Sequence, residues 1–350
     1  MERVPKTQFA SRLLRWYDRH GRKDLPWQIR RTPYRVWVAE VMLQQTQVAT
    51  VIPYFEQFIR HFPDVEQLAA ADTDEVLHYW SGLGYYARGR NLLKTARLLV
   101  EQYQGRFPES AEALQALPGI GRSTAAAILA QAFGQQHAIL DGNVKRVLAR
   151  YFALPGWPGE RRVSEQLWTY SEMLTPSKRV ADYTQAIMDL GALVCTRRNP
   201  SCTECPVRND CRAWLAQAVE AYPASRPARK LPVRSVQMLI LLNSKGELLL
   251  QKRPPSGIWG GLLSFPEIPS EEDATLWCER YVGRVTRLQP RPSFQHTFSH
   301  FQLQIRPVHG KLVRLKAQVR DDTAWQWFRP GVSVAGLAAP VRSLITQLNG

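Results

Sequence analysis

Four of the five cysteines lie close together in the pattern Cys-x6-Cys-x2-Cys-x5-Cys, at Cys195, Cys202, Cys205 and Cys211. Four thiolates at these intervals can bind one tetrahedral metal ion or one [4Fe–4S] cluster. Zinc ribbons usually present two separated Cys-x2-Cys pairs and only one is present here, but spacing alone does not decide between the metals. With the fifth cysteine, Cys278, far away, the tight group indicates a metal site rather than disulfides.

Two carboxylates lie in surroundings that suit acid–base chemistry. Glu40 is flanked by apolar residues at 38–39 and 41–42, so desolvation could raise its pKa enough for it to hold a proton. The alternative for Glu40 is a glutamate on the surface of a helix. Asp141 stands just before a helical segment at 143–152, where aspartate is also a natural N-cap. Each residue alone therefore has an ordinary structural explanation.

A glycine-containing turn, Leu117-Pro118-Gly119-Ile120-Gly121, separates two helical segments. Gly119 and Gly121 let the backbone turn tightly and approach another backbone closely. The helix that follows begins with free N–H groups and a positive dipole end, which suits a phosphate, and Arg122 adds charge. An ordinary connection between helices would also explain the turn.

Helical periodicity dominates residues 1–222, which are expected to position these groups. One helical run extends from Pro33 to Phe62. Further helices are predicted at 74–80, 88–103, 109–117, 122–133, 143–152, 164–174 and 184–194.

Residues 223–235 are rich in proline and basic residues and read as an extended linker. Beyond them the period changes to two. Strands at 236–242 and 247–252 flank a turn, and Phe301, Leu303 and Ile305 alternate as another strand. With a helix at 271–282, the sequence predicts a small α+β domain over 236–350.

The net charge of +16, from 46 Lys and Arg against 30 Asp and Glu, predicts attraction to a polyanion such as nucleic acid. No apolar run approaches the length of a membrane-spanning helix. The N-terminal residues MERVPKTQFA contain no signal-peptide core. We therefore expect a cytoplasmic, nucleoid-associated monomer that binds no membrane.

The hairpin, the following aspartate and the cysteine group together resemble the helix-hairpin-helix DNA glycosylase superfamily. Within it, the chain is similar to the MutY family over nearly its whole length. The similarity is carried by the runs Leu25-Pro26-Trp27, Trp37-Val38-Ala39-Glu40-Val41-Met42-Leu43-Gln44-Gln45-Thr46, Gly82-Leu83-Gly84-Tyr85-Tyr86-Ala87-Arg88, Leu140-Asp141-Gly142-Asn143-Val144-Lys145-Arg146 and Phe298-Ser299-His300.

This resemblance implies a multidomain protein. An all-α helix-hairpin-helix glycosylase domain over 1–222, holding a [4Fe–4S] cluster, would precede the linker and a C-terminal α+β Nudix (MutT)-like domain over 236–350. The implied substrate is double-stranded DNA in which adenine is paired with 8-oxoguanine or guanine.

The resemblance also implies catalytic roles. Glu40 would protonate adenine at N7, so that the base leaves uncharged, and could then assist the incoming water. Asp141 would stabilise the oxocarbenium-like sugar by its charge or by a transient bond. Asn143 would orient the water or the carboxylate.

Adenine must leave the base stack to be excised. By resemblance, Tyr85 would wedge into the stack and Gln45 would fill the vacated space. The remaining expected base contacts are Thr46 and Leu83 to 8-oxoguanine, and Trp27 and Gln185 to adenine. Trp27 and Tyr85 could instead be core aromatics.

Position 123 separates two subclasses of the superfamily. Bifunctional relatives carry a nucleophilic lysine in Gly-x-Gly-Arg-Lys, whereas this chain has Ser123 there. A hydroxyl cannot form a Schiff base with the opened sugar as an amine can. The sequence therefore predicts a monofunctional glycosylase that leaves an intact abasic site.

The stretch 254–266 resembles the Nudix fold. A hydrolytic Nudix helix needs an Arg-Glu-x-x-Glu-Glu run to hold Mg²⁺, and the acidic residues at 271–273 and 279 do not fit it. We therefore expect no pyrophosphohydrolase activity. The resemblance implies that this domain reads 8-oxoguanine through three loop residues: Phe298, Ser299 and His300, of which His300 could instead be structural.

Two other functions remain possible from the sequence. One is a bifunctional glycosylase and lyase acting on damaged pyrimidines, which Ser123 and Glu40 disfavour. The other is a DNA-binding or redox protein without enzymatic activity, which the presence of both Glu40 and Asp141 disfavours.

Overall fold

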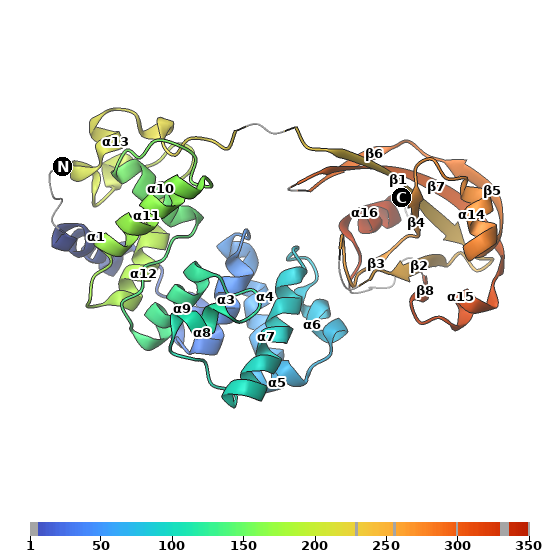
Figure 1. The fold of residues 1–350 in the computed structure, drawn as a ribbon, viewed down its shortest axis with the longest axis horizontal. Helices are drawn as coiled ribbons and strands as arrows, with labels where there is room; N and C mark the ends of the chain where they lie inside the picture. The colour runs from blue at the N-terminus through green and yellow to red at the C-terminus, as the bar shows by residue number, and fades with distance from the viewer. Residues whose placement is uncertain (1–5, 228–229, 255–256, 299, 330–335, 349–350) are drawn as a thin grey trace. The chain divides into compact units, whose positions relative to one another are not determined.

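The computed structural model describes residues 6–227, 230–254, 257–298, 300–329 and 336–348. The chain divides into two compact units, Met1–Ala228 and Arg229–Gly350 (Figure 1). The division falls inside the segment that the sequence predicts as a linker. In the described part of the chain, no helix combines the length and the hydropathy that crossing a bilayer requires.

The described part of the N-terminal unit is helical, coloured blue to yellow in Figure 1. Its α-helices are α1 (Lys6–His20), α2 (Pro26–Ile29), α3 (Pro33–Leu43), α4 (Val48–His61), α5 (Val65–Ala70), α6 (Thr73–Trp80), α7 (Ala87–Tyr103), α8 (Ala111–Gln115), α9 (Arg122–Phe133), α10 (Gly142–Tyr151), α11 (Arg161–Leu174), α12 (Val180–Asp189) and α13 (Arg212–Leu215). A π-helical turn, Leu190–Val194, follows α12, and short 3-10 turns span Cys202–Glu204, Arg208–Asp210 and Val219–Ala221.

Helix α9 connects two hydrophobic cores. Ala125, Ile128 and Leu129 belong to the core built with α2 to α8. Ala126 and Ala127 belong to the core built with α1, α10, α11 and α12. Its small alanines allow neighbouring helices to approach α9 from both sides, so α9 fixes the two halves of the unit relative to each other.

The helical run expected from Pro33 to Phe62 is interrupted, which corrects the sequence interpretation. Helix α3 ends at Leu43, and Gln45 adopts a left-handed backbone with φ of 59°. Apolar spacing on the two helices stays nearly in phase, so periodicity alone could not reveal this break. Similarly, the helix expected at 184–194 is α12 followed by the π-helical turn.

Arg88 of α7 fills the space where α3 ends. It is 8% exposed, and its guanidinium donates to three carbonyl oxygens of that segment, at Val41, Met42 and Gln44. Burial lowers its pKa to about 10, so it stays charged at neutral pH. One side chain therefore satisfies helix-terminal acceptors that would otherwise need water.

The C-terminal unit is built on a mixed sheet with the strand order β3-β2-β1-β7-β5. The strands are β1 (Val233–Leu242), β2 (Leu248–Lys252), β3 (Leu263–Ser264), β4 (Glu267–Pro269), β5 (Gly283–Pro290), β6 (Phe294–Thr297), β7 (Gln302–Leu315) and β8 (Trp325–Phe328). The helices are α14 (Ala274–Tyr281), α15 (Ala317–Asp321) and α16 (Ala339–Leu348).

The expected hairpin is confirmed, since β1 and β2 are antiparallel with Leu242 opposite Leu248. The alternation in β7 is confirmed as well, with Leu303 and Ile305 buried. Strand β1 is parallel to β7 and buried along 237–241, as a central strand covered on both faces must be.

Two boundaries of this unit differ from the expectation. Strand β1 begins at Val233, because 233–235 pair with 302–304 of β7, so the linker ends earlier than the sequence predicts. Helix α14 is shorter than the expected 271–282, because Asp273 caps it by accepting hydrogen bonds from the backbone of residues 275 and 276.

We predict that Arg88→Met destabilises the helical unit by about 3 kcal/mol, because it leaves several buried carbonyl groups without donors. Urea unfolding followed by circular dichroism of the helices measures the change. Arg97→Met is the matched control: Arg97 also donates to two carbonyl groups from α7, at Ala69 and Ala71, but is exposed. Equal losses in the two variants would contradict the role of burial.

Candidate active site

A cavity of about 1150 Å³ opens on the N-terminal unit and is lined by both candidate carboxylates, Glu40 and Asp141. The lining also contains six other residues singled out from the sequence: Trp27, Gln45, Thr46, Ser123, Asn143 and Gln185. These residues lie on or directly beside α2, α3, α9, α10 and α12. The cavity therefore gathers groups that are far apart in the sequence.

Glu40 lies on α3 and is half-buried, reaching the cavity from the core side. Burial raises its pKa to about 7, and the nearby charge of Asp141 adds to this rise. A hydrogen bond from Gln131 Nε2 to Glu40 Oε1, 3.2 Å long, acts in the opposite direction. Near neutral pH this carboxyl group can therefore hold a proton and release it.

Asp141 has two structural partners. Its Oδ1 accepts a hydrogen bond of 2.7 Å from the Val144 backbone, and its Oδ2 accepts one of 3.2 Å from Asn143 Nδ2. The N-cap alternative from the sequence is thus correct for α10. Burial raises the pKa of Asp141, while these bonds and the charge of Arg146 oppose the rise. The hydrogen bonds of the cap favour the ionised form of Asp141 and so oppose the effect of burial.

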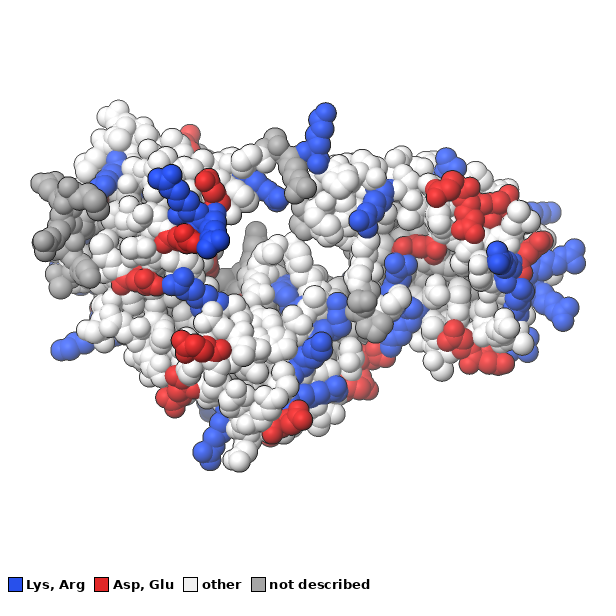
Figure 2. Space-filling model, in the orientation of Figure 1, with Lys and Arg blue, Asp and Glu red and all other residues white. Residues whose placement is uncertain are grey.

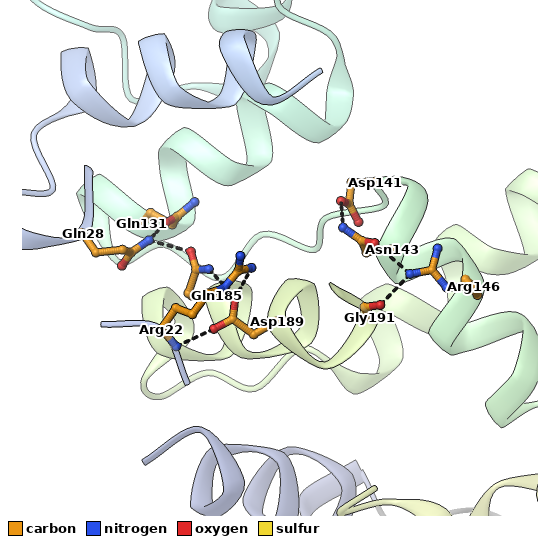
Figure 3. Close-up of polar contacts among 9 residues, drawn as sticks. All are labelled: Arg22, Gln28, Gln131, Asp141, Asn143, Arg146, Gln185, Asp189 and Gly191. Atoms are coloured by element: carbon orange, nitrogen blue, oxygen red, sulfur yellow. Dashed lines mark hydrogen bonds and ion pairs between the residues drawn. The ribbon is translucent and has the colours of Figure 1, made fainter. Parts of the chain in front are cut away.

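Asn143 belongs to a second set of bonds, drawn in Figure 3. Its Oδ1 accepts a hydrogen bond of 2.8 Å from Arg146 Nη2, which also donates to the Gly191 carbonyl at 2.6 Å. Arg146 Nε donates to the backbone oxygen of Cys195 at 2.7 Å. The start of α10 is therefore tied to the first cysteine of the cysteine-rich loop.

Ser123 lines the cavity at the start of α9, and its Oγ accepts a hydrogen bond of 3.0 Å from the backbone N–H of Leu140. The hydroxyl group thereby fixes the residue that precedes Asp141. This contact gives Ser123 a positioning role. The sequence comparison with relatives that have a lysine at this position did not suggest it.

The hairpin needs its glycine at position 119. Gly119 has φ of +80°, and an added Cβ would lie 2.9 Å from Asn91 Cβ. Gly121 precedes α9, whose first turn receives no side-chain cap, so its N–H groups can meet an anion. Arg122 is half-exposed but forms an ion pair with Glu172, so its contribution of positive charge is smaller than the sequence implies.

The expected base-contacting residues differ in exposure. Tyr85 is 55% exposed with φ of 47°, and Gln45 is also exposed. Thr46 is half-buried, and its hydroxyl group accepts a bond from Arg88. Leu83 is 5% exposed and packs in the first core, so most of its side chain is buried.

Two further candidates are buried. Trp27 is 3% exposed and packs edge-to-face against Phe55, so the core-aromatic alternative describes most of its surface. Gln185 is 3% exposed, and its amide group bonds to Gln28 and Asp189. Both still reach the cavity wall.

Basic side chains of the cavity wall are Arg22, Lys145, Arg146 and Arg197. On the face shown in Figure 2, by contrast, Lys and Arg are interspersed with Asp and Glu over the N-terminal unit. The four cations of the cavity wall can attract a polyanion locally.

The candidate reading loop of the C-terminal unit is aromatic. Phe298 stacks on Phe301 with ring centroids 4.5 Å apart and lies 5.4 Å from Trp259. His300 packs at 4.8 Å against Phe301. Ser299 lies outside the described residues.

A curated relative, "Adenine DNA glycosylase" of Buchnera aphidicola subsp. Acyrthosiphon pisum, is 37% identical over 343 residues, covering 98% of each chain. The chain belongs to the adenine DNA glycosylase family. The Homo sapiens adenine DNA glycosylase is 39% identical over 361 residues, covering 85% of this chain and 66% of the human protein.

Family models agree with this membership in the adenine DNA glycosylase family. Residues 38–173 match the HhH-GPD superfamily of base excision DNA repair proteins, 195–211 match the iron–sulfur binding domain of endonuclease III, and 237–347 match a NUDIX domain. The predicted fold class, a helix-hairpin-helix domain followed by a Nudix-like α+β domain, is confirmed.

Solved structures resemble the helical part. A thermostable thymine-DNA glycosylase has a TM-score of 0.55 and 29% identity, covering 60% of this chain and 97% of its own. Endonuclease III in a non-covalent complex with DNA has a TM-score of 0.52 and 22% identity, covering 61% of this chain and 99% of its own, and shows the fold alone.

The cysteine loop of this adenine DNA glycosylase family member fits an iron–sulfur cluster. Cys195, Cys202, Cys205 and Cys211 line one small apolar pocket beside α10. Four thiols can hold either zinc or an iron–sulfur cluster. The match of 195–211 to the iron–sulfur binding domain of endonuclease III decides for the cluster.

The surroundings of the thiols agree with this reading. Burial raises the pKa of Cys205 to about 12, so a thiolate there needs the positive charge of bound iron. Arg150, 3% exposed, points its guanidinium at Cys195 Sγ, 3.4 Å away, and such donors support cluster sulfurs. The expected [4Fe–4S] cofactor is confirmed by the family match and would hold the loop 195–211 against α10.

Several residues around the site were not identified from the sequence as site residues. Gln28, Gln131 and Asp189 are buried around Glu40 and Gln185, and Arg22 bonds Asp189. The sequence signals these residues only as polar side chains on the buried side of a helix. That signal does not identify the residues with which they form hydrogen bonds. The positioning role of Arg88 was missed for the same reason.

We predict that Cys205→Ser strongly lowers bound iron and the broad visible absorbance of the purified protein, because one cluster ligand is lost. Metal and acid-labile sulfide analysis measures the effect. Cys278→Ser is the control, since Cys278 is buried in the C-terminal unit and should leave iron unchanged. Zinc in place of iron in the unaltered protein would refute the cluster.

Proposed function

We propose that this protein hydrolyses the N-glycosidic bond of adenine mispaired with 8-oxoguanine or guanine in double-stranded DNA. Glu40 acts as the general acid and Asp141 stabilises the sugar cation. The observation that carries the proposal is the shared cavity, in which a carboxyl group with a pKa of about 7 accompanies a helix-capping carboxylate. We place the activity in the cytoplasm, on nucleoid DNA, and expect a monomer to suffice.

Each carboxyl group has a distinct task in this mechanism. Adenine is a poor leaving group as an anion, so Glu40 donates its proton to N7 as the bond to the sugar breaks. Asp141 is ionised and stabilises the positive charge that develops on the deoxyribose. Asn143, which donates to Asp141, holds this carboxylate and can orient the attacking water.

Entry of adenine into the cavity requires the base to be flipped out of the duplex. Exposed Tyr85 and Gln45 are the side chains proposed to enter the stack, and Thr46 the one to contact the opposite guanine. The uncapped start of α9, at Gly119 and Gly121, is proposed to bind a phosphate. The C-terminal unit is proposed to read 8-oxoguanine through its aromatic loop at 298–300.

The product is proposed to be an intact abasic site. Position 123 offers a hydroxyl group that already accepts a bond from Leu140, and no amine stands there to attack the sugar. Strand cleavage by β-elimination is therefore not part of the proposed reaction.

Glu40→Gln should lower the single-turnover rate of adenine release at least about a hundredfold, the scale of general acid catalysis, while DNA binding persists. Glu56→Gln, the same substitution at an exposed site of α4, is the control. In the unaltered protein the rate should fall as pH rises through about 7, because Glu40 loses its proton. A Glu40→Gln variant with normal excision would remove Glu40 from the mechanism.

The unaltered protein should break an A:8-oxoguanine strand only after alkali treatment. Ser123→Lys places an amine at the cavity and should allow borohydride to trap a protein–DNA adduct. Lys145 also lines the cavity, so trapping is compared in a Lys145→Gln background with and without Ser123→Lys. No adduct in the double variant would show that position 123 does not face the sugar.

A further inference from the structure

Three buried side-chain amides form a hydrogen-bonded row, drawn in Figure 3, and the last of them, Gln131, donates to Glu40. Gln28, Gln131 and Gln185 come from α2, α9 and α12, and their exposed fractions are 7%, 5% and 3%. Buried amides are costly unless each donor and acceptor finds a partner. The hydrogen bonds among the three amides determine whether each one turns its oxygen or its NH₂ group toward the next residue of the row.

One end of the row is fixed by a carboxylate. Asp189 is fully buried and accepts hydrogen bonds from Arg22, including one of 2.6 Å from Nη2. It also accepts a bond of 2.7 Å from Gln185 Nε2. An ionised carboxylate only accepts, so Gln185 must turn its NH₂ group toward Asp189 and its oxygen toward Gln28.

The middle of the row is fixed by a second charged group. Gln28 Nε2 donates to Gln185 Oε1 at 2.6 Å and to Gln131 Oε1 at 2.9 Å. Gln28 Oε1 accepts a bond of 2.7 Å from Arg31 Nε. A guanidinium only donates, so the orientation of the Gln28 amide is set by Arg31 as well as by Gln185.

These two constraints decide what Glu40 receives. Because Gln131 accepts from Gln28 through its oxygen, its NH₂ group must face Glu40, where Nε2 lies 3.2 Å from Oε1. Glu40 Oε1 accepts this hydrogen bond. If the acidic proton of Glu40 were on Oε1, it would compete with the N–H of Gln131 for the same oxygen, so Oε1 is the less favourable position for it. Oε2 is left as the oxygen that carries it.

We propose that Gln131 is a positioning residue for Glu40: held by Gln28, its amide occupies Oε1 and thereby keeps the transferable proton on Oε2. The proposal rests on the proposed role of Glu40 as general acid. It assigns the row a catalytic purpose, since one defined oxygen must meet the adenine ring nitrogen for proton transfer.

Other charged groups near Glu40 also affect its pKa, and they remain unchanged when Gln131 alone is substituted. Asp141 raises its pKa from the start of α10. The cations on the wall of the same cavity are Arg22, Lys145, Arg146 and Arg197. A change in pH dependence after substitution of Gln131 alone is therefore due to the lost amide.

The decisive variant is Gln131→Met, which keeps the length of the side chain and removes the donor. Removing a bond to the ionised carboxyl group favours its protonated form. The basic limb of the single-turnover rate should move to higher pH by roughly one pH unit, the scale of one hydrogen bond to a charged group. The plateau should fall about tenfold, because the carboxyl group is no longer oriented.

Gln136→Met is the matched control. Gln136 follows α9 and donates to the Thr175 carbonyl at 2.9 Å, outside the row, so the pH profile should not change. Gln28→Met should shift the limb in the same direction as Gln131→Met by a smaller amount. It should add nothing in a Gln131→Met background, since its effect passes through Gln131.

An unchanged basic limb in Gln131→Met, measured while Glu40→Gln abolishes excision, would overturn the positioning role and leave the Glu40 assignment standing. Normal excision by Glu40→Gln would instead overturn the proposed function itself. If Gln131→Met fails to fold, Gln28→Met decides: a limb identical to that of the unaltered protein overturns the proposal, and a shift to higher pH supports it.

Discussion

Two carboxyl groups that are both desolvated and lie on one cavity cannot both be ionised at low cost, and this constraint governs the site formed by Glu40 and Asp141. The surroundings divide the roles between them. Asp141 receives a backbone N–H from the start of a helix, which favours its charge. Glu40 accepts a hydrogen bond of 3.2 Å from Gln131 and is buried enough for its pKa to rise to about 7, so it is the group that can hold a proton near neutral pH.

That division depends on how α9 is packed. The helix lies between two hydrophobic cores, carries Ser123 at its first turn and presents Gln131 near its end. Ser123 bonds the residue before Asp141, and Gln131 bonds Glu40. One helix thus bonds to Glu40 and to the residue before Asp141, so core packing limits variation in the distance between the two proposed catalytic groups.

Buried and half-buried arginines perform a similar task elsewhere in the helical unit. Arg88 binds the end of α3, Arg146 connects the start of α10 to Cys195, and Arg150 binds the backbone of the cysteine loop. Each guanidinium offers several donors in a fixed plane, which suits segments whose carbonyl groups lack helical partners. Part of the strong basic excess of the chain therefore serves its architecture rather than DNA binding.

The sequence by itself determined the features that depend on neighbours in the chain. The N-cap at Asp141, the hairpin between β1 and β2, the alternation in β7 and the cysteine spacing all follow from local chemistry. Such features depend on backbone geometry over a few residues, which composition and periodicity report directly. Family resemblance then supplied the activity that local patterns leave open.

Only the tertiary structure decided which distant residues meet. Gln131 and Glu40 are 91 positions apart, and no spacing rule connects polar residues on the buried sides of two helices. Leu83 is expected to contact a base, and only the structure shows that its side chain packs into the first core while its carbonyl group accepts a bond from Arg88. The break after α3 was hidden as well, because the side chain that stabilises it, Arg88, comes from another helix. Contacts between residues that are distant in the sequence depend on the packing of the whole fold. A pattern in the sequence therefore does not show directly which residues form them.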